Sequence, residues 1–297
     1  MADIYELRNR IEGLQQIESM TYSMQIITIS RLKKIIDKTT SIKAAVDDLA
    51  FIISYLNDAS PLFGSSFFKD EARVKGAPIF VTFLSNRGFC GYFNHDMLQK
   101  TEGLVKSMGL SPSDQDHIFV GKKSPELKRH KKWQSVDIMM PVKDIYTADE
   151  IEALLQLIRA KQKVSADGSI RPVYIIYSQF QSILKQTLIT ERLFPADRNM
   201  IREVPKTDLL YFVEPADPDT SEEFGKQWYY TKLLQAAFDA SCSEFSQRFL
   251  IMKSAVDNVR TLNDELTLEL NKERQRIITQ ELSEIVGTFK ALKSSRS

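Results

Sequence analysis

The stretch that decides the fold is "FDASCSEFSQRFLIMKSAVDNV", residues 238–259. Its apolar side chains recur at alternating steps of four and three residues, which places them on one face of an α-helix. The members of this stripe are Phe238, Cys242, Phe245, Phe249, Met252, Val256 and Val259. Alternating fours and threes are the heptad pattern by which helices pair in coiled coils. The stripe therefore predicts a long helix with these seven residues in a coiled-coil core.

The helix around this stripe is predicted to extend far on both sides. No proline lies between Ser221 and Leu292, and only Gly225 and Gly287 interrupt the run. Proline and glycine are the residues that most disfavour a helix interior. We therefore predict a C-terminal coiled-coil helix over residues 220–297, roughly 100 Å long at 1.5 Å per residue.

The amino-terminal segment, residues 1–60, supplies a second long helix. Between Asp3 and Asn57 it has no proline and one glycine, Gly13. Its apolar residues advance by threes and fours, but the register slips near Ile17 and again after Ile27, which indicates a drifting stripe rather than a strict heptad. Two long helices at opposite ends of one chain predict an antiparallel coiled coil. The longer C-terminal helix is expected to overhang its partner, and "NKERQR" at residues 271–276 is expected to fall in the overhang.

The middle of the chain, residues 61–219, reads as alternating strands and helices. Segments rich in β-branched and aromatic residues predict five strands: "PIFVTFLS", "HIFVG", "VDIMM", "PVYIIYSQF" and "KQTLITERLF". Between two of them, "ADEIEALLQLIRAKQ" has helical spacing. Strands that alternate with helices predict an open α/β sheet. The expected fold class is α/β, with a Rossmann-like domain inserted between the two helices of the coiled coil.

Composition excludes several classes of function. The chain has 40 Lys and Arg against 39 Asp and Glu, so bulk attraction to nucleic acid or anionic lipid is not implied. Cys90 and Cys242 lie far apart, and the three histidines share no metal-binding spacing. No uncharged run reaches the roughly 20 residues that span a bilayer. We expect no cofactor and no metal, and any link to a membrane is expected to come through a partner.

Two further motifs contain residues that could carry chemistry. "SNRGFCGYFN", residues 85–94, has a G-x-x-G spacing that fits a tight turn better than a nucleotide-binding loop. Cys90 as a nucleophile lacks a base with an orienting third group.

The basic run at residues 122–133 leaves nucleic-acid binding open, although a solvated face or a protein contact is favoured. The chain is therefore not expected to be catalytic.

The two predicted helices also carry basic bands. One band covers residues 31–43, and the other covers residues 271–297. Within the second band, "NKERQR" at residues 271–276 interrupts the apolar stripe between Leu270 and Ile277 with a polar collar. Basic bands near the free end of a helical rod predict a partner that is acidic there.

These residues carry a resemblance to a known family. "LNDELTLELNKERQRIITQELSEIVG", residues 262–287, resembles the carboxyl-terminal signature of the gamma subunit of F-type ATP synthases, the central rotor shaft. The matching positions are Asn271, Arg274, Gln275, Ile278, Thr279, Glu281, Leu282, Glu284, Ile285 and Val286. "SNRGFCGYFN" and "RFLIMKSAVDN" are similar to two further stretches of that family. The resemblance covers the chain from end to end.

The resemblance implies a non-catalytic central-stalk subunit. Such a subunit couples rotation of a membrane ion-translocating ring to sequential conformational change at the nucleotide sites of an alpha/beta ring. The implied partners are the alpha and beta subunits, the epsilon subunit and the membrane c-ring, with no nucleic acid. The implied location is peripheral, on the cytoplasmic side of a bacterial inner membrane. The alternative is a gamma-like coiled-coil adaptor, or a specialised F-type-like ATPase subunit that is not coupled to ion transport.

The resemblance also assigns residues to contact with the surrounding ring and to coupling. They are Met24, Arg248, Asn271, Arg274, Gln275, Arg276, Thr279 and Glu281. The chain departs from the family pattern at Tyr22, which replaces a lysine, and at Ile29, which replaces a small residue. Small residues let two helices approach closely, so Ile29 predicts looser or re-registered packing. Asn86 and Tyr92 are further departures.

Overall fold

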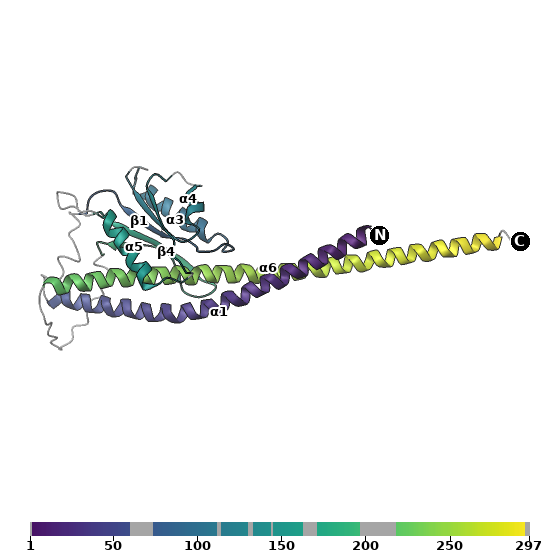
Figure 1. Ribbon diagram of the computed structural model, residues 1–297, viewed down its shortest axis with the longest axis horizontal. Helices are drawn as coiled ribbons and strands as arrows, with labels where there is room; N and C mark the ends of the chain where they lie inside the picture. The colour runs from purple at the N-terminus through teal and green to yellow at the C-terminus, as the bar shows by residue number, and fades with distance from the viewer. Residues whose placement is uncertain are drawn as a thin grey trace. The chain divides into compact units, whose positions relative to one another are not determined.

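The structure of this chain is a computed structural model, and it describes residues 2–59, 74–111, 114–129, 133–143, 145–162, 171–196 and 218–294 (Figure 1). The chain forms two compact units. The first is Thr28–Arg248, and the second combines Met1–Ile27 with Phe249–Ser297. These bounds differ from the three segments predicted from the sequence, because each long helix contributes residues to both units.

The first unit contains a five-stranded sheet in the order β3-β2-β1-β4-β5. The strands are β1 (Ile79–Phe83), β2 (Asp116–Val120), β3 (Val136–Met139), β4 (Val173–Phe180) and β5 (Gln186–Phe194). The first four are parallel, and β5 runs antiparallel to β4. All five predicted strands are present, and the predicted open α/β sheet is confirmed. The connection from β4 to β5 is too short for a crossover helix, so the last strand can only return antiparallel.

Three helices complete the α/β part: α3 (Phe93–Ser107), α4 (Ser124–Arg129) and α5 (Ala148–Lys161). Helix α5 is the predicted helix, and Thr147 and Glu150 form a capping box at its start. Ile151, Leu154 and Ile158 on its inner face are almost fully buried. Helix α3 packs against β1 and β4. The hydroxyls of Thr82 and Thr101 are 3.1 Å apart across that contact.

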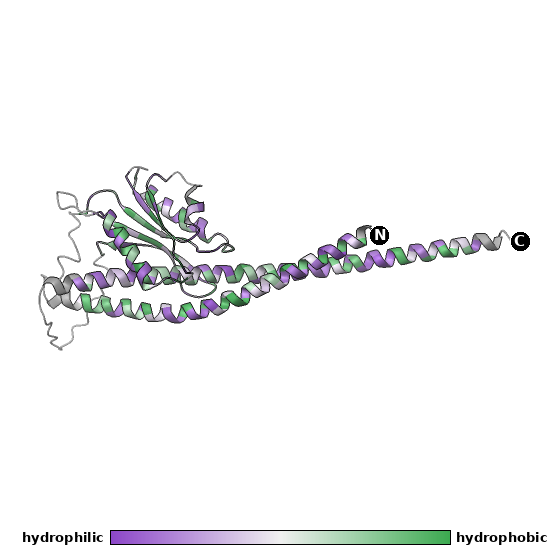
Figure 2. Ribbon diagram, viewed as in Figure 1, coloured by the Kyte–Doolittle hydropathy of each residue, from purple (hydrophilic) through white to green (hydrophobic). Residues whose placement is uncertain are grey.

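Both long helices predicted at the ends of the chain are present, as α1 (Ala2–Ala59) and α6 (Pro218–Ser294). Figure 2 shows hydrophobic and hydrophilic residues alternating along both helices. In the first unit every residue of α6 from 235 to 246 is buried. This stretch packs in the same hydrophobic core as Leu32 and Ile35 of α1 and the apolar residues of the sheet. A helix covered on all sides can keep polar groups only where they find partners.

The inward face of α1 corrects one prediction. One set of buried and half-buried residues follows a strict heptad: Leu7, Ile11, Leu14, Glu18, Thr21, Gln25, Thr28, Leu32, Ile35, Thr39, Ile42, Val46, Leu49 and Ile53. The predicted drift of the stripe between Ile17 and Ile27 is therefore wrong. Apolar residues on both sides of this segment share one heptad frame, and a continuous helix keeps that frame through the polar middle. Ile17, Met20, Met24 and Ile27 consequently lie on the exposed side of α1.

Candidate functional site

The seven residues of the stripe predicted on α6 lie on a buried or half-buried face of that helix. Phe238, Cys242 and Phe245 in the first unit, and Met252 and Val256 in the second, are each at most 5% exposed. Phe249 and Val259 are half-buried. The same heptad continues through half-buried positions at 263, 266, 270, 273 and 277. In the second unit the pairing is antiparallel, and Arg260 Nε lies 2.6 Å from Glu18 Oε1.

The collar at residues 271–276 lies next to α1 rather than beyond it. Because the helices are antiparallel, moving eleven residues back from Glu18 and eleven forward from Arg260 brings Leu7 opposite Asn271. Glu273 and Ile277 are accordingly half-buried. The prediction that the collar falls in the overhang is therefore wrong. The overhang begins after Ile277, and Figure 1 shows the end of α6 extending past the start of α1.

The collar side chains predicted to contact a ring are exposed. Asn271, Arg274, Gln275 and Arg276 all face solvent, as do Thr279 and Glu281 beyond the collar. Arg276 Nε lies 2.6 Å from Glu273 Oε2, and this contact lowers the pKa of Glu273. Thr279 donates a hydrogen bond to the carbonyl of Gln275 at 2.9 Å. The collar thus presents a polar, basic surface on a continuous helix.

The overhang itself is apolar on one face. Every residue from 278 to 290 is exposed, including Ile278, Leu282, Ile285 and Phe289 at 53–70%. Steps of four, three and four residues place these four side chains on one face. Exposed apolar surface of this extent marks a site of interaction with another molecule. We call this face the apolar tip.

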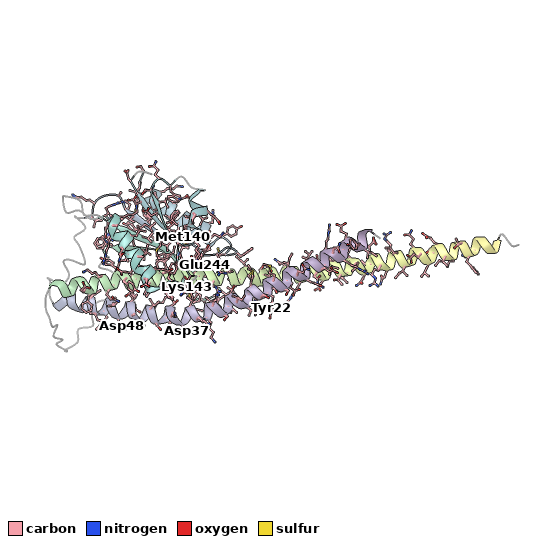
Figure 3. The ribbon with its side chains drawn as sticks, viewed as in Figure 1. Tyr22, Asp37, Asp48, Met140, Lys143 and Glu244 are labelled. Atoms are coloured by element: carbon pink, nitrogen blue, oxygen red, sulfur yellow. The ribbon has the colours of Figure 1, made fainter. Side chains whose placement is uncertain are left out.

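Exposed apolar residues also lie on α1 in the same unit. Ile17, Met20, Met24 and Ile27 share one side of the helix, and Tyr22 and Ile26 lie on another, with exposed fractions from 36 to 64%. Figure 3 labels Tyr22 on this part of α1. Met24, predicted as a coupling residue, is therefore accessible to a partner. Ile29, the departure predicted to loosen the packing, is half-buried and packs against the core of the first unit.

Arg248 corrects a prediction. It was expected to contact a surrounding ring, but it is 6% exposed. Its Nη2 lies 2.5 Å from Glu244 Oε1, and its Nε donates to the carbonyl of Gly88 at 3.0 Å. The guanidinium is therefore bound within the first unit to the loop that follows β1. These contacts join α6 to that loop.

Glu244, labelled in Figure 3, completes this network and is not among the residues predicted from the sequence. Its carboxylate accepts hydrogen bonds from the backbone N–H of Asn86 at 3.0 Å and of Arg87 at 3.1 Å. Burial raises the pKa of Glu244, while Arg248 and these two N–H groups oppose that rise. The signal in the sequence was a Glu and an Arg four residues apart beside a heptad core.

The loop held by this network contains the motif "SNRGFCGYFN". The predicted tight turn between strand and helix is confirmed, with Phe89 at φ 59° and Gly91 at φ 58°. Asn94 closes the turn, because its Oδ1 accepts from the backbone N–H of Ser85 at 2.8 Å. Phe89 and Tyr92 point outward and are 67% and 79% exposed. Burial raises the pKa of the Cys90 thiol, which disfavours the thiolate that a nucleophile needs.

The basic run at residues 122–133 is described only in part, because residues 130–132 lie outside the described ranges. Lys123 Nζ pairs with Glu126 at 2.9 Å, and Lys122 Nζ donates to the carbonyl of Val142 at 2.7 Å. Trp133 packs on His117, with ring centroids 4.1 Å apart. A ring packed inward cannot stack on a base, so these contacts do not favour a nucleic-acid surface.

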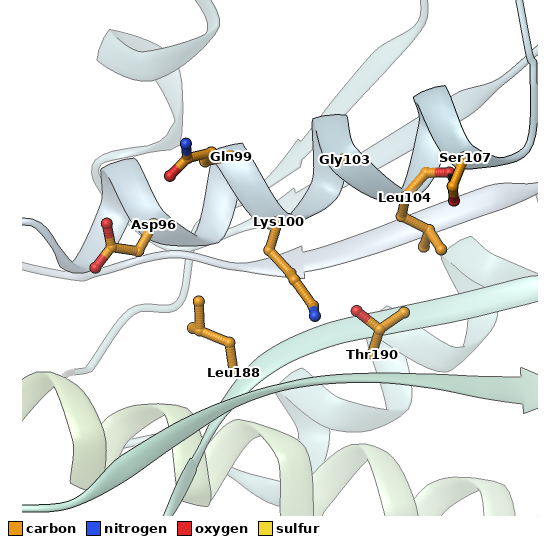
Figure 4. A pocket seen from close by; sticks show the side chains of 8 residues that line it. All are labelled: Asp96, Gln99, Lys100, Gly103, Leu104, Ser107, Leu188 and Thr190. Carbon is orange, nitrogen blue, oxygen red and sulfur yellow. Dashed lines mark hydrogen bonds between the residues drawn. The ribbon is translucent and has the colours of Figure 1, made fainter.

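One groove lies between α3 and β5, with a volume of about 510 Å³ (Figure 4). Its lining residues are Asp96, Gln99, Lys100, Gly103, Leu104, Ser107, Leu188 and Thr190. Asp96 and Lys100 are its charged side chains, and both lie on α3.

Within the described ranges, no group of three His, Cys, Asp or Glu side chains is placed to hold a metal ion. None of the described helices is both long enough and apolar enough to cross a bilayer.

Comparison with known proteins gives one consistent result. The model of a family described as ATP synthase matches residues 3–292. The ATP synthase gamma chain of Stenotrophomonas maltophilia is 27% identical over 287 residues, covering 97% of this chain and 98% of that protein. The gamma chain of Nitrosomonas eutropha is 27% identical over 293 residues, with the same coverage.

A solved structure is similar as well. It is a chain of the Euglena gracilis mitochondrial ATP synthase rotor, determined by cryo-electron microscopy in rotational state 1. Its TM-score is 0.66 at 16% identity, over 93% of this chain and 99% of that one, which shows a shared fold. With the family model matched from residue 3 to residue 292, this chain belongs to the gamma-chain family of ATP synthases.

Proposed function

We propose that this chain is the central-stalk rotor subunit of an F-type ATP synthase. It couples rotation of a membrane ion-translocating ring to sequential conformational change at the nucleotide sites of an alpha/beta ring. The chain itself performs no bond-breaking step. Its contribution is a coupling free energy between distant sites, carried by a stiff helix pair.

The observation that carries this proposal is the end of α6. From Ile278 to Phe289 the helix exposes a continuous apolar stripe that is not paired with α1. A lone helix with an apolar face needs a partner outside the chain to bury that face. In a central stalk, the bore of a surrounding ring supplies that partner. Membership of the gamma-chain family along almost the entire chain agrees with this use of the tip.

Below the tip, the collar supplies the polar contacts. We assign the ring-facing contacts to Met24 on α1 and to Asn271, Arg274, Gln275, Arg276, Thr279 and Glu281 on α6, all of which are exposed. Basic residues there fit acidic loops on the partner, because opposite charges favour correct pairing. Arg248 is assigned to positioning of the loop after β1 instead of direct contact.

The remaining assignments follow from a rotor role. The partners are the alpha and beta subunits at the collar and tip, and the epsilon subunit and c-ring at the α/β domain. The chain lies at the cytoplasmic face of a bacterial inner membrane and is held there by its partners. It needs no cofactor of its own.

The test is co-expression with the alpha and beta subunits encoded beside this chain, followed by size-exclusion chromatography and an ATPase assay. A complex of three alpha, three beta and one gamma chain, with activity that depends on this chain, is the expected result. Arg274→Ala/Arg276→Ala should weaken assembly or coupling and leave the isolated fold intact. A chain that folds but never enters the ring would contradict the rotor role and favour the adaptor alternative.

A further inference from the structure

Lys43 and Asp239 lie in the first unit, where three elements meet. Lys43 is on α1, Asp239 is on α6, and Phe180 is the last residue of β4. Lys43 Nζ lies 2.9 Å from Asp239 Oδ1 and donates a hydrogen bond to the carbonyl of Phe180 at 3.0 Å. One ammonium group therefore joins both long helices and the carboxyl end of a central strand.

The surroundings of Asp239 make this pair costly. Its side chain is 0% exposed, whereas that of Lys43 is 33% exposed. The carboxylate interacts with the Lys43 ammonium and with the backbone of Phe180. Burial raises the pKa of Asp239, and Lys43 is the strongest influence against that rise. A buried ion pair is often no more stabilising than apolar residues of the same volume, because removing the charges from water is costly. Stability alone therefore does not explain the pair.

Register does explain it. An apolar coiled-coil core repeats every seven residues, so it resists separation of the helices but tolerates sliding by a heptad. A polar pair in a single layer removes that freedom, because any other register leaves a buried charge unpaired. A second polar contact lies one turn away, where Thr39 Oγ1 is 3.3 Å from Cys242 Sγ. Both contacts join α1 to α6.

The sheet is fixed to α6 by separate bonds. Ser243 Oγ donates to the carbonyl of Ser178 at 2.9 Å, and Gln247 Nε2 donates to Gln186 Oε1 at 2.7 Å. Lys232 Nζ pairs with Glu191 at 2.8 Å. Lys43 then ties α1 to the end of the same sheet. Within the first unit, the sheet and the two helices thus share one set of polar bonds.

We propose that Lys43 and Asp239 are positioning residues that hold α1 in register against α6 and the carboxyl end of β4. Torque applied to either helix then passes to the other without slip. This inference rests on the proposed function, because register under torque matters only for a turning shaft. It is separable from that function, because register can also be measured in the isolated chain.

The test compares two ways of removing the pair. Asp239→Asn and Lys43→Met each break it, and Lys43→Met/Asp239→Leu replaces it with apolar side chains. In the assembled complex in vesicles, the ratio of ATP-driven ion uptake to ATP hydrolysis should fall about threefold in the double variant. Its thermal midpoint should stay close to that of the unchanged chain. The matched control is Lys123→Met/Glu126→Leu, which removes an exposed pair of the same length and should alter neither quantity.

A purely structural role predicts the opposite result. If the double variant matched the unchanged chain in both thermal midpoint and coupling ratio, the positioning role would be overturned. The isolated full chain gives a second readout through spin labels at Asp47 and Gln227, which are exposed on α1 and α6. The double variant should broaden the distribution of distances between the labels, since a slip of one heptad displaces a helix by about 10 Å. A distribution as narrow as in the unchanged chain would also contradict the proposal. Failure of the unchanged chain to assemble would refute the rotor function alone.

Discussion

Two stretches of the same helix differ in almost every respect. Residues 235–246 of α6 are all buried, yet they include Asp239, Ser243 and Glu244. Residues 278–290 are all exposed, yet they include Leu282 and Phe289. Helix propensity does not separate the two stretches, because both are helical. Ser243 and Glu244 of the buried stretch find hydrogen-bond partners within the chain, whereas the apolar groups of the tip need partners outside it.

The largest expected change in the free energy of unfolding comes from placing the same negative charge in the buried stretch and in the exposed one. Phe245→Asp puts a carboxylate where the side chain is 3% exposed, so it should cost more than about 4 kcal/mol or prevent folding. Phe289→Asp puts it where the side chain is 70% exposed, so stability should change by less than about 0.5 kcal/mol. Urea unfolding of the two variants checks this. Equal losses would mean that the tip is covered within the chain.

The next effect concerns the buried polar network. Glu244→Gln keeps the shape of the side chain but leaves Arg248 buried beside a neutral group, so we expect a loss of about 3 kcal/mol. The exposed Glu284→Gln is the matched control on the same helix and should change the unfolding free energy little. Protection of the backbone amides of Asn86 and Arg87 from hydrogen exchange should fall in the first variant. Unaltered protection would contradict the role given to Glu244.

The sequence predicted the elements well because their signals are local. Five strands, helix α5 and both long helices could be predicted from the spacing of apolar residues, from residue type and from the positions of proline and glycine. The heptad of α6 placed Phe238, Cys242, Phe245, Met252 and Val256 correctly, since an apolar stripe reports its own burial.

The frame of α1 could not be predicted in the same way. Between Glu18 and Thr28 the inward positions are polar, and the apolar residues stand one position earlier in the chain. The stripe therefore pointed to the wrong face, because the frame is set by the apolar residues on either side. Arg248 shows a second limit, since a family position does not reveal that its guanidinium is bound to the carbonyl of Gly88. Such contacts depend on distant parts of the chain.

An effect of intermediate size is expected in the dependence of stability on pH. His117 is buried beside Phe80 and Trp133, and burial lowers its pKa from 6.5 to about 4. As pH falls, the unfolded chain takes up a proton on His117 before the folded chain does. The stability that neutral, buried His117 contributes is therefore present above pH 6.5 and is lost as pH falls toward 4. Between pH 7 and pH 5 the loss should be about 2 kcal/mol. The free energy of unfolding, measured with urea, should change less between pH 7 and pH 5 in His117→Phe than in the unchanged chain, by that amount. An equal change in both chains would contradict this role of His117.

The smallest effect tests the frame of α1 directly. Thr21→Leu fills an inward position with an apolar side chain and should stabilise the isolated chain by about 1 kcal/mol. Ile17→Gln removes an apolar group that is 52% exposed, so it should change stability by less than about 0.5 kcal/mol. The drifting stripe predicted from sequence demands the reverse, because it buries Ile17 and exposes Thr21. Thermal unfolding of the two variants decides between the frames, and a large loss for Ile17→Gln with no gain for Thr21→Leu would restore the drifting stripe.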